Sequence, residues 1–309
     1  MNRAASIDIG SNTIRLLIAE KTSNGEFREL ESIRAITRLG EGMNTEKYLR
    51  TNRMDATIEK LKSFKKKLMA YEPLPLLAVA TSAVREAKNQ DEFIAKAKNA
   101  GIEVCVISWK EEAQLTLDGV FWKIPDEGKD TLTFDIGGGS TEFILSRGKE
   151  VKQSFGSSLG VVRLTERFIS RSPTDPKEYS ALTDFLEQEL AAIREQLNTF
   201  TPERVIGTAG TVTTLAAIDK NIFPYDPEKI HRAIIKQERI NAIQEDLMRK
   251  TLEERLGLAA LEKGREDLII VGTAIVLATL KAFACSQLTV SEYSLREGLL
   301  LKAFAEKTS

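Results

Sequence analysis

The segment FDIGGGST holds three consecutive glycines between an acidic residue and two hydroxyl residues. Asp135 lies before the glycines and Ser140 follows them. Glycine weakens a strand, but it lets backbone N–H groups converge on an anion, because close approach and a positive φ cost little there. A carboxylate beside such a turn can bind a metal ion. The pattern indicates a phosphate-binding hairpin turn beside a metal ion, with a plain glycine-rich hairpin as the alternative.

A second segment repeats this plan near the start of the chain, SIDIGSNTIRLLIAE at residues 6–20. When Asp8 is aligned with Asp135, Gly10 falls on Gly137. The same sequence offset aligns two strand–turn–helix segments, LLAVATSAVREA and ERVIGTAGTVTTL. Two coincidences at one offset predict a duplicated domain whose halves face each other across a cleft. Such a cleft is a favoured ligand site.

A strand–GTAGT–helix segment in the second half resembles loops that bind phosphate through the amides of a helix N-terminus. Its candidate residues are Gly207, Gly210 and Thr211. A tight turn between a strand and a helix is the alternative. Arg85 falls in the first turn of the helix that follows LLAVATS, where a cation opposes the helix dipole. It is therefore either a surface arginine or an anion-binding one.

Two glutamates, Glu111 and Glu112, fall in the first turn of a predicted helix at residues 108–121. Acidic residues are common there because they complement the helix dipole. This helix joins the two repeated halves, so its first turn is expected close to the cleft and to both glycine-containing turns. A carboxylate in that position could act as a general base on a water molecule that attacks a phosphate.

Composition limits the class of protein. The 309 residues fit one large or two ordinary domains, and 42% hydrophobic residues are enough for two cores. A net charge of −1 argues against general polyanion binding, so any anion site must be local. The single histidine, His231, excludes a His-based metal cluster. The two cysteines, Cys105 and Cys285, are expected to be buried thiols of a cytosolic protein.

Hydrophobic periodicity predicts alternating strands and helices along the chain. A hairpin is predicted at residues 4–20 and long helices at 51–71 and 177–200, and residues 231–264 are expected to be mostly helical. The N-terminal segment has no signal-peptide pattern, and the apolar run Leu268–Leu280 is shorter than a membrane span requires. These features favour a cytoplasmic α/β protein.

Nine motifs occur in order along the chain. They are DIGSNTIRLL, RLGEG, ATSAVREA, EEA, DIGGGSTE, SLGVVRLTERF, GTAGTVTTLA, RED with a later Gly272, and SLREGLL. Together they resemble the exopolyphosphatase/guanosine pentaphosphate phosphatase (Ppx/GppA) family of the actin/sugar-kinase/hsp70 superfamily. The resemblance covers essentially the whole chain, and it is to the short two-domain members that lack appended helical domains.

The resemblance implies an α/β fold of two ribonuclease-H-like (actin-like ATPase) domains that face each other across a cleft. The N-terminal domain is expected at residues 1–125 and the C-terminal domain at residues 126–309. The closing helix, at about 295–309, is expected either to stay with the C-terminal domain or to pack back on the N-terminal one.

The resemblance also implies a site. Its catalytic residues would be Glu112, which orients or deprotonates the attacking water, together with Glu142 and Asp135. The implied phosphate-binding residues are Ser11, Asn12, Thr13, Arg15, Arg85, Gly137, Gly138, Gly139, Ser140, Thr141, Gly207, Gly210 and Thr211. Mg²⁺, with Mn²⁺ as the alternative, would be held by Asp8 and Asp135 directly or through water and would polarise the phosphate. Phosphoryl transfer needs positioning and charge neutralisation more than covalent help.

The leading hypothesis is an exopolyphosphatase that releases terminal phosphate from inorganic polyphosphate. Conversion of guanosine pentaphosphate to tetraphosphate is the closest alternative, because the loop motifs do not distinguish the two substrates. A superfamily kinase is disfavoured by Glu112, since a kinase usually activates its acceptor hydroxyl with an aspartate. A non-catalytic nucleotide or alarmone sensor is disfavoured because the set of carboxylates is intact. No nucleic-acid or membrane partner is expected, and a homodimer follows from family analogy alone.

Overall fold

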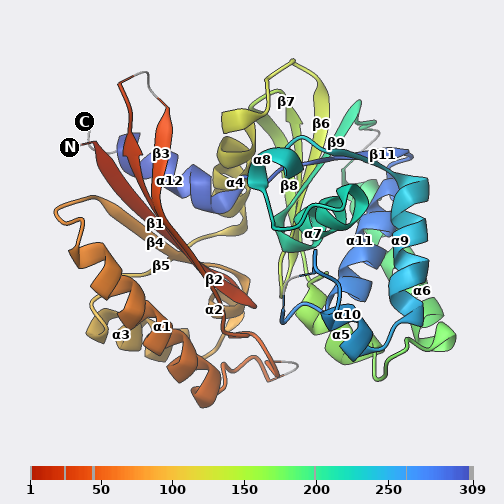
Figure 1. Cartoon of the computed structure of the whole chain (residues 1–309), viewed down its shortest axis with the longest axis horizontal. Coiled ribbons are helices and arrows are strands. Elements are labelled where there is room, and N and C mark those ends of the chain that lie inside the picture. Colours follow the sequence, from red (N-terminus) through yellow and green to blue (C-terminus); the bar gives the residue numbers. More distant parts are fainter. Residues whose placement is uncertain (1, 24–25, 44–45, 198–199, 262, 306–309) are drawn as a thin grey trace. The chain divides into compact units, whose positions relative to one another are not determined.

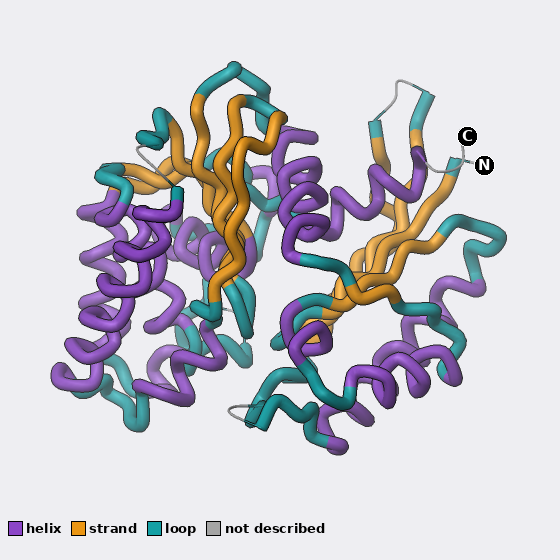
Figure 2. Tube along the Cα trace, turned by 180° about the vertical axis from the view of Figure 1, so that it is seen from behind, coloured by secondary structure: helices purple, strands orange, loops and turns teal. Residues whose placement is uncertain are grey.

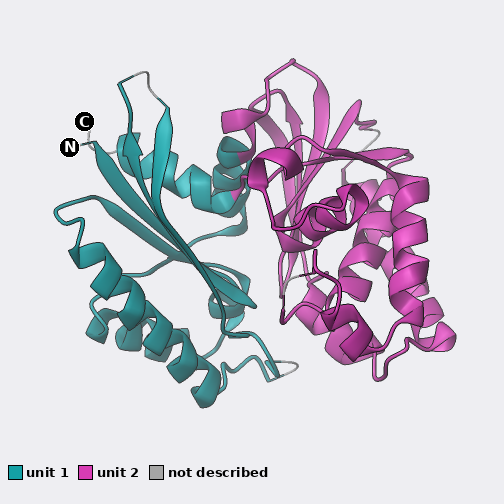
Figure 3. Ribbon diagram, in the orientation of Figure 1, with its two compact units in different colours: residues 1–119, 295–309 teal, residues 120–294 magenta. Residues whose placement is uncertain are grey.

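The computed structural model describes residues 2–23, 26–43, 46–197, 200–261 and 263–305. The chain divides into two compact units, which Figure 3 shows in separate colours. Unit 1 comprises residues 1–119 and 295–309, and unit 2 comprises residues 120–294. The sequence-based boundary at 125/126 lies a few residues later in the chain. The closing helix belongs to unit 1.

Unit 1 contains a five-stranded mixed sheet (Figure 1). Its strands, in the order in which they lie in the sheet, are β3 (Phe27–Ile36), β2 (Thr13–Lys21), β1 (Arg3–Ile9), β4 (Leu76–Ala80) and β5 (Cys105–Val106). The first three pair antiparallel, and β1, β4 and β5 pair parallel. The predicted N-terminal hairpin is thereby confirmed. Because β1 and β4 are parallel, their carboxyl ends meet at one edge of the sheet.

Helices cover both faces of this sheet, with α1 and α12 on opposite sides (Figure 1). The helices are α1 (Thr51–Met69), α2 (Ser82–Glu86), α3 (Gln90–Asn99), α12 (Leu295–Ala305) and α4 (Trp109–Lys123), which continues into unit 2. Side chains of β1 alternate between the two faces. Ile7 lies in the core under α1, whereas Ala4 packs with Leu300 and Ala303 of α12. The period of two places Asp8 on the same face as Ala4.

Unit 2 repeats this plan with one additional strand. Its six-stranded sheet has the order β10 (Ile234–Lys236), β11 (Gln287–Val290), β9 (Arg204–Thr208), β6 (Asp130–Ile136), β7 (Thr141–Arg147) and β8 (Glu150–Ser157). The strands β6, β7 and β8 pair antiparallel, and β6, β9 and β11 pair parallel. Except for the edge strand β10, this order matches that of unit 1, as the repeated sequence pattern predicts.

The helices of unit 2 gather on one side of its strands (Figure 2). They are α5 (Val161–Phe168), α6 (Pro176–Gln196), α7 (Ala209–Lys220), α8 (Pro227–Ile230), α9 (Gln237–Arg249), α10 (Leu252–Leu256) and α11 (Ile269–Ala282). Helix α11 is apolar on nearly every face because it packs between α6, α7 and α9. Within the described ranges, no helix has the length and apolar character needed to cross a membrane.

The prediction that residues 231–264 are mostly helical holds for α9 and α10 but misses one strand. Ile234–Lys236 form β10, an edge strand that pairs antiparallel with β11. Three residues are too few for hydrophobic alternation to reveal a strand. Residues 198–199 and 306–309 of two predicted helices, and residue 262 of the predicted helical stretch 231–264, lie outside the described residues.

The prediction that both cysteines are buried is wrong. Cys105 is exposed and Cys285 is half-buried, and both are free thiols. Strand β5 has two residues and lies at the edge of its sheet, so Cys105 has a neighbouring strand on one side only. Burial raises the pKa of the Cys285 thiol. Apolar neighbours in the sequence therefore did not ensure burial of Cys105.

A glycine sets the distance between α12 and α4 in unit 1. A Cβ atom on Gly298 would lie 1.8 Å from the carbonyl oxygen of Leu115. Leu115 follows Glu112 by about one helical turn of α4 and packs with Leu295 and Leu299 in one apolar cluster. The position of α4 in unit 1 therefore depends on the absence of a side chain at Gly298.

Replacement of Gly298 by alanine should lower the urea midpoint of unfolding, because a methyl group cannot fit unless α12 moves away from α4. Overpacking of this kind costs about 1–3 kcal/mol. Gly257→Ala is the matched control. Gly257 has helical φ and ψ, and a Cβ atom added there would meet nothing closer than a carbonyl oxygen at 3.3 Å. Circular dichroism in urea measures both variants. A wild-type midpoint for Gly298→Ala would contradict this packing role.

Candidate active site

The turn between β6 and β7 is held by hydrogen bonds to the start of α5. Gly137 N–H donates to the carbonyl of Ser140 at 2.8 Å and closes the turn. Val161 N–H donates to the carbonyl of Gly137 at 3.1 Å, and Val162 N–H donates to that of Gly138 at 2.9 Å. The first amides of α5, which have no partners within their own helix, thus bind the carbonyl oxygens of the turn.

Unlike the carbonyl oxygens of the turn between β6 and β7, its N–H groups after that of Gly137 lack hydrogen-bond partners among the described residues. Among the described residues, no hydrogen-bond acceptor is found for the backbone N–H groups of Gly138, Gly139 and Ser140. Successive backbone N–H groups that are free in a turn can bind an anion such as a phosphate oxygen. The turn therefore has its carbonyl oxygens bonded and its N–H groups available, as anion binding requires.

Gly160 allows α5 to start this close to the turn. A Cβ atom on Gly160 would lie 2.2 Å from the carbonyl carbon of Gly139 and 2.4 Å from the carbonyl oxygen of Gly138. Thr141 adds a second contact, because its hydroxyl donates to the carbonyl of Leu159. Gly160 was not among the predicted site residues. The feature of the sequence that could have pointed to Gly160 is its position at the start of a predicted helix.

The turn between β1 and β2 in unit 1 has the same construction. Gly10 N–H donates to the carbonyl of Thr13 at 3.0 Å. The carbonyl of Asn12 accepts from two N–H groups of the segment after β3, and that of Ser11 accepts from Gly40 N–H at 2.8 Å. Asn12 Oδ1 is buried and has no donor among the residues that the structure describes. Both turns therefore leave polar groups that a ligand or water can satisfy.

The two turns differ in the residues that face each other across the flanking strands. In unit 1 Asp8 lies opposite Arg15, whereas in unit 2 Asp135 lies opposite Glu142. Cross-strand partners project from the same face, with Cβ atoms roughly 4.5–5.5 Å apart. An arginine favours the ionised form of a neighbouring carboxyl group, and a second carboxylate disfavours it. The duplicated site is thus electrostatically unequal in its two copies.

Burial raises the pKa of Asp8 above its ordinary value, because the carboxylate loses contact with water. The positive charges of Arg15 and Arg296 act in the opposite direction, and the negative charge of Glu297 adds to the increase. Arg296 is itself bonded to Glu297, with Nε donating to Oε1 at 2.7 Å. Asp8 therefore lies in a charged environment whose net effect still disfavours its ionised form.

The carboxylate pair of unit 2 has the chemistry of a site for a hard cation. Glu142 is 4% exposed, and the Ser140 hydroxyl donates to its Oε1 at 2.7 Å. Mg²⁺ prefers oxygen ligands and keeps several waters, so one or two carboxylates suffice to hold it. In the described part of the chain, no group of three or more His, Cys, Asp or Glu side chains could hold a metal ion. Asp135 and Glu142 thus fit a largely hydrated Mg²⁺ ion.

Arg85 and Glu112 form a largely buried ion pair in unit 1. Arg85 Nη1 donates to Glu112 Oε2 at 2.7 Å and to the carbonyl of Ile107 at 3.0 Å. The two side chains are only 14% and 8% exposed, so a surface position for Arg85 is excluded. The pair connects α2, which contains Arg85, to the first turn of α4, which contains Glu112.

The neighbouring glutamate has the ordinary role of an acidic residue in a first turn. Glu111 is exposed, and its Oε2 accepts from the N–H and the hydroxyl of Ser108 at 2.9 and 2.7 Å. These hydrogen bonds lower the pKa of Glu111. The structure thus separates the two glutamates of the predicted helix start, since Glu111 caps α4 and Glu112 pairs with an arginine.

The GTAGT segment packs closely at the start of α7. A Cβ atom on Gly207 would lie 2.9 Å from the ring of a core phenylalanine, and one on Gly210 would lie 2.1 Å from the guanidinium carbon of Arg265. The Thr211 hydroxyl oxygen would lie 2.4 Å from a Cβ atom on Gly272. Each of the three predicted residues therefore has a packing contact, and phosphate binding by them stays a prediction. Arg265 belongs to the RED motif but was not among the predicted site residues, and it places positive charge beside this turn.

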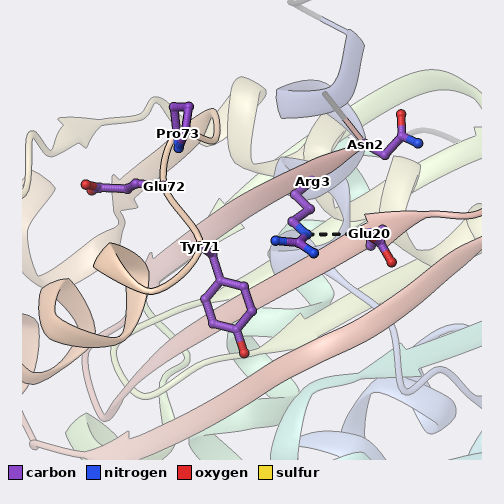
Figure 4. Close-up of a pocket in the computed structure, with 6 residues that line it drawn as sticks. All are labelled: Asn2, Arg3, Glu20, Tyr71, Glu72 and Pro73. Atoms are coloured by element: carbon purple, nitrogen blue, oxygen red, sulfur yellow. Dashed lines mark hydrogen bonds and ion pairs between the residues drawn. The ribbon is translucent and has the colours of Figure 1, made fainter.

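A pocket of about 480 Å³ in unit 1 is separate from these residues (Figure 4). Its lining residues are Asn2, Arg3, Glu20, Tyr71, Glu72 and Pro73. Arg3 Nε donates to Glu20 Oε1 at 3.3 Å, so two of its charged groups are paired with each other. The pocket lies at the first residues of β1, whereas Asp8 lies near the other end of that strand. None of the predicted site residues lines it.

Two units with one sheet order, each with a glycine-containing turn after an aspartate, define the two-domain actin-like class of α/β proteins. The family model for the Ppx/GppA phosphatase family matches residues 17–307. Exopolyphosphatase 2 of Mycobacterium tuberculosis is 31% identical over 97% of this chain and 98% of its own.

Two solved structures are also similar to the chain. The Ppx/GppA family member of Aquifex aeolicus has 33% identity and a TM-score of 0.84, over 99% of both chains. An exopolyphosphatase of Cytophaga hutchinsonii has 30% identity and a TM-score of 0.91, over 98% of both chains. The chain belongs to the Ppx/GppA phosphatase family. Its chemistry is that of a phosphoric anhydride hydrolase.

Replacement of Asp8 by asparagine should stabilise the metal-free protein at neutral pH. The pKa of Asp8 in the folded protein lies above its ordinary value of 3.8. Protonated Asp8 therefore stabilises the fold fully below pH 3.8, and this stabilisation is lost as pH rises through the folded-state pKa. An asparagine side chain at this position would not ionise. The difference in thermal midpoint between Asp8→Asn and the wild type, measured in EDTA, should therefore widen between pH 4 and pH 7. A constant difference over that range would contradict the burial effect.

Proposed function

We propose that this chain is an exopolyphosphatase, which hydrolyses the terminal phosphate of inorganic polyphosphate. The observation on which this rests most is the turn at residues 137–140, whose free N–H groups lie next to the carboxylates of Asp135 and Glu142. A turn of this kind suits a phosphate together with a cation. The names of similar proteins add support, since the relatives from M. tuberculosis and C. hutchinsonii are both called exopolyphosphatases.

In the proposed reaction, the N–H groups of Gly138, Gly139 and Ser140 donate to non-bridging oxygens of the terminal phosphate. Glu112 orients a water molecule and accepts its proton as the water attacks phosphorus. The pairing with Arg85 holds the Glu112 carboxylate in place before the reaction. Mg²⁺, when held by Asp135 and Glu142 with Asp8 as a further ligand, would neutralise phosphate charge and polarise the scissile bond.

Guanosine pentaphosphate remains the alternative substrate, because its terminal phosphate could meet the same turn and the same glutamate. The resemblance to the Ppx/GppA family implies either of the two substrates, and the turn would bind only the phosphate end of each. A non-catalytic nucleotide or alarmone sensor would need the turns but not Glu112. A cytoplasmic location and a homodimer stay predictions from the sequence.

Glu112→Gln should lower turnover of polyphosphate by about 10²–10⁴-fold, because glutamine cannot accept the proton of the attacking water. Binding of substrate should change little. Glu111→Gln is the matched control, since Glu111 is adjacent in the sequence but caps α4. Phosphate release should be measured from long polyphosphate, short polyphosphate and guanosine pentaphosphate in parallel.

The pattern of release separates the candidate functions. Release from polyphosphate that is lost in Glu112→Gln and kept in Glu111→Gln would support the proposal. Release from guanosine pentaphosphate alone would favour the alternative substrate. If Glu112→Gln lowered the affinity for substrate as much as the turnover rate, Glu112 would not be the general base. If no phosphate were released from any of the three substrates, the non-catalytic sensor would be the function still supported.

Asp135→Asn should raise the concentration of Mg²⁺ needed for half-maximal activity, because one charged oxygen ligand is replaced by a neutral one. Asp130→Asn is the matched control on the same strand, since Asp130 is bonded to Arg147 at the other end of β6. Titration of phosphate release with Mg²⁺ measures the effect. An unchanged Mg²⁺ requirement in Asp135→Asn would place the metal ion elsewhere.

A further inference from the structure

Trp109 stacks on the arginine that holds Glu112. The guanidinium carbon of Arg85 lies 3.7 Å from the centre of the Trp109 ring. Trp109 is the first residue of α4 and Glu112 follows it by about one helical turn, so the two side chains project from neighbouring positions of one helix. The guanidinium thus contacts α4 twice, through its face with Trp109 and through one edge with Glu112.

The hydrogen bonds of Arg85 are confined to one nitrogen. Nη1 donates to both Glu112 and the carbonyl of Ile107. Nε and Nη2 are buried, and within the described residues they have no acceptor. A buried donor without an acceptor is costly, so this edge of the guanidinium calls for a partner that comes from outside the unit's own residues. Nε and one terminal nitrogen of arginine together match two oxygens of a phosphate.

We propose that Trp109 is a positioning residue that holds the guanidinium plane of Arg85. In this orientation the Nη1 edge directs the Glu112 carboxylate, and the Nε–Nη2 edge stays available for two phosphate oxygens of the substrate. Trp109 itself contacts neither substrate nor water in this arrangement. The inference deepens the proposed function, because it explains how one arginine can fix the general base and bind the reacting anion.

The stack matters because arginine has a long and mobile side chain. Without an aromatic face beneath it, the guanidinium can rotate about its last bonds and exchange one edge for the other. If Arg85 rotated so that Nε or Nη2 reached Glu112, the donors for phosphate would be lost. A flat ring at 3.7 Å permits only orientations in which the guanidinium lies parallel to it or nearly so, and cation–π attraction favours them.

Kinetics provide the first test. Trp109→Leu should lower kcat and raise KM for polyphosphate, because both functions of Arg85 depend on the stack, and kcat/KM should fall by roughly 10–100-fold. Trp109→Phe should recover most of the loss, since it restores an aromatic face. Trp122→Phe is the control, because Trp122 also belongs to α4 but contacts Tyr293 instead. Wild-type kcat and KM in Trp109→Leu would overturn the inference.

Fluorescence provides a test that does not depend on turnover. The chain has two tryptophans, so Trp122→Phe leaves Trp109 as the only tryptophan, and excitation at a wavelength that tyrosine does not absorb selects its emission. Titration of this variant with inorganic phosphate should change the tryptophan emission, because the anion binds the guanidinium that stacks on the ring. The double variant Trp122→Phe, Arg85→Leu should not respond, and neither should Trp109→Phe, which retains Trp122.

The two tests distinguish failure of this inference from failure of the proposed function. An emission response of Trp109 that requires Arg85, in a protein that releases no phosphate from polyphosphate, would support the inference and reject the exopolyphosphatase. If the protein released phosphate from polyphosphate but the Trp109 emission did not change when phosphate was added, the inference would be overturned and the proposed exopolyphosphatase function would stand. Equal loss of activity in Trp109→Leu and Trp109→Phe would also overturn it, because an aromatic face would then be irrelevant.

Discussion

Both candidate phosphate-binding turns depend on one constraint, which is that the carbonyl oxygens of a tight turn need donors. In unit 2 the amides at the start of α5 provide them, and in unit 1 the segment after β3 does. Once the carbonyl side of each turn is bonded, the N–H side is left for an anion. The close approach of Gly160 to the Gly138–Gly139 peptide follows from this constraint, because α5 can reach the carbonyls only if no side chain intervenes.

The duplication gave the two units one topology but different charges at equivalent places. Arg15 lies across from Asp8, and Glu142 lies across from Asp135. The exchange of arginine for glutamate puts a negative charge beside Asp135 where a positive charge lies beside Asp8, so the two carboxylates of unit 2 fit a hard cation better than the pair in unit 1 does. The backbone of the turn is therefore the shared feature, and the cross-strand residue determines which chemistry each copy supports.

The sequence predicted the parts of the fold that depend on local pattern. The aspartate–glycine turns, the repeated topology and the helix that begins near Glu112 follow from residue types and spacing. The edge strand β10 and the exposure of Cys105 did not, because both depend on which strand lies at the edge of a sheet. The contact of Trp109 with Arg85 was also beyond the sequence, since the two residues lie on different elements that only tertiary packing brings together.

The place of α12 in the chain has a consequence for synthesis on the ribosome. This helix covers the face of β1 that contains Ala4, yet all of unit 2 is translated between the first part of unit 1 and α12. Unit 2 is contiguous in the sequence, so it can complete its core while the chain is still growing. The sheet of unit 1 has to wait with one apolar face uncovered until residue 305 has emerged. Nascent unit 1 therefore exposes apolar surface that the completed chain covers, and such surface is prone to aggregate.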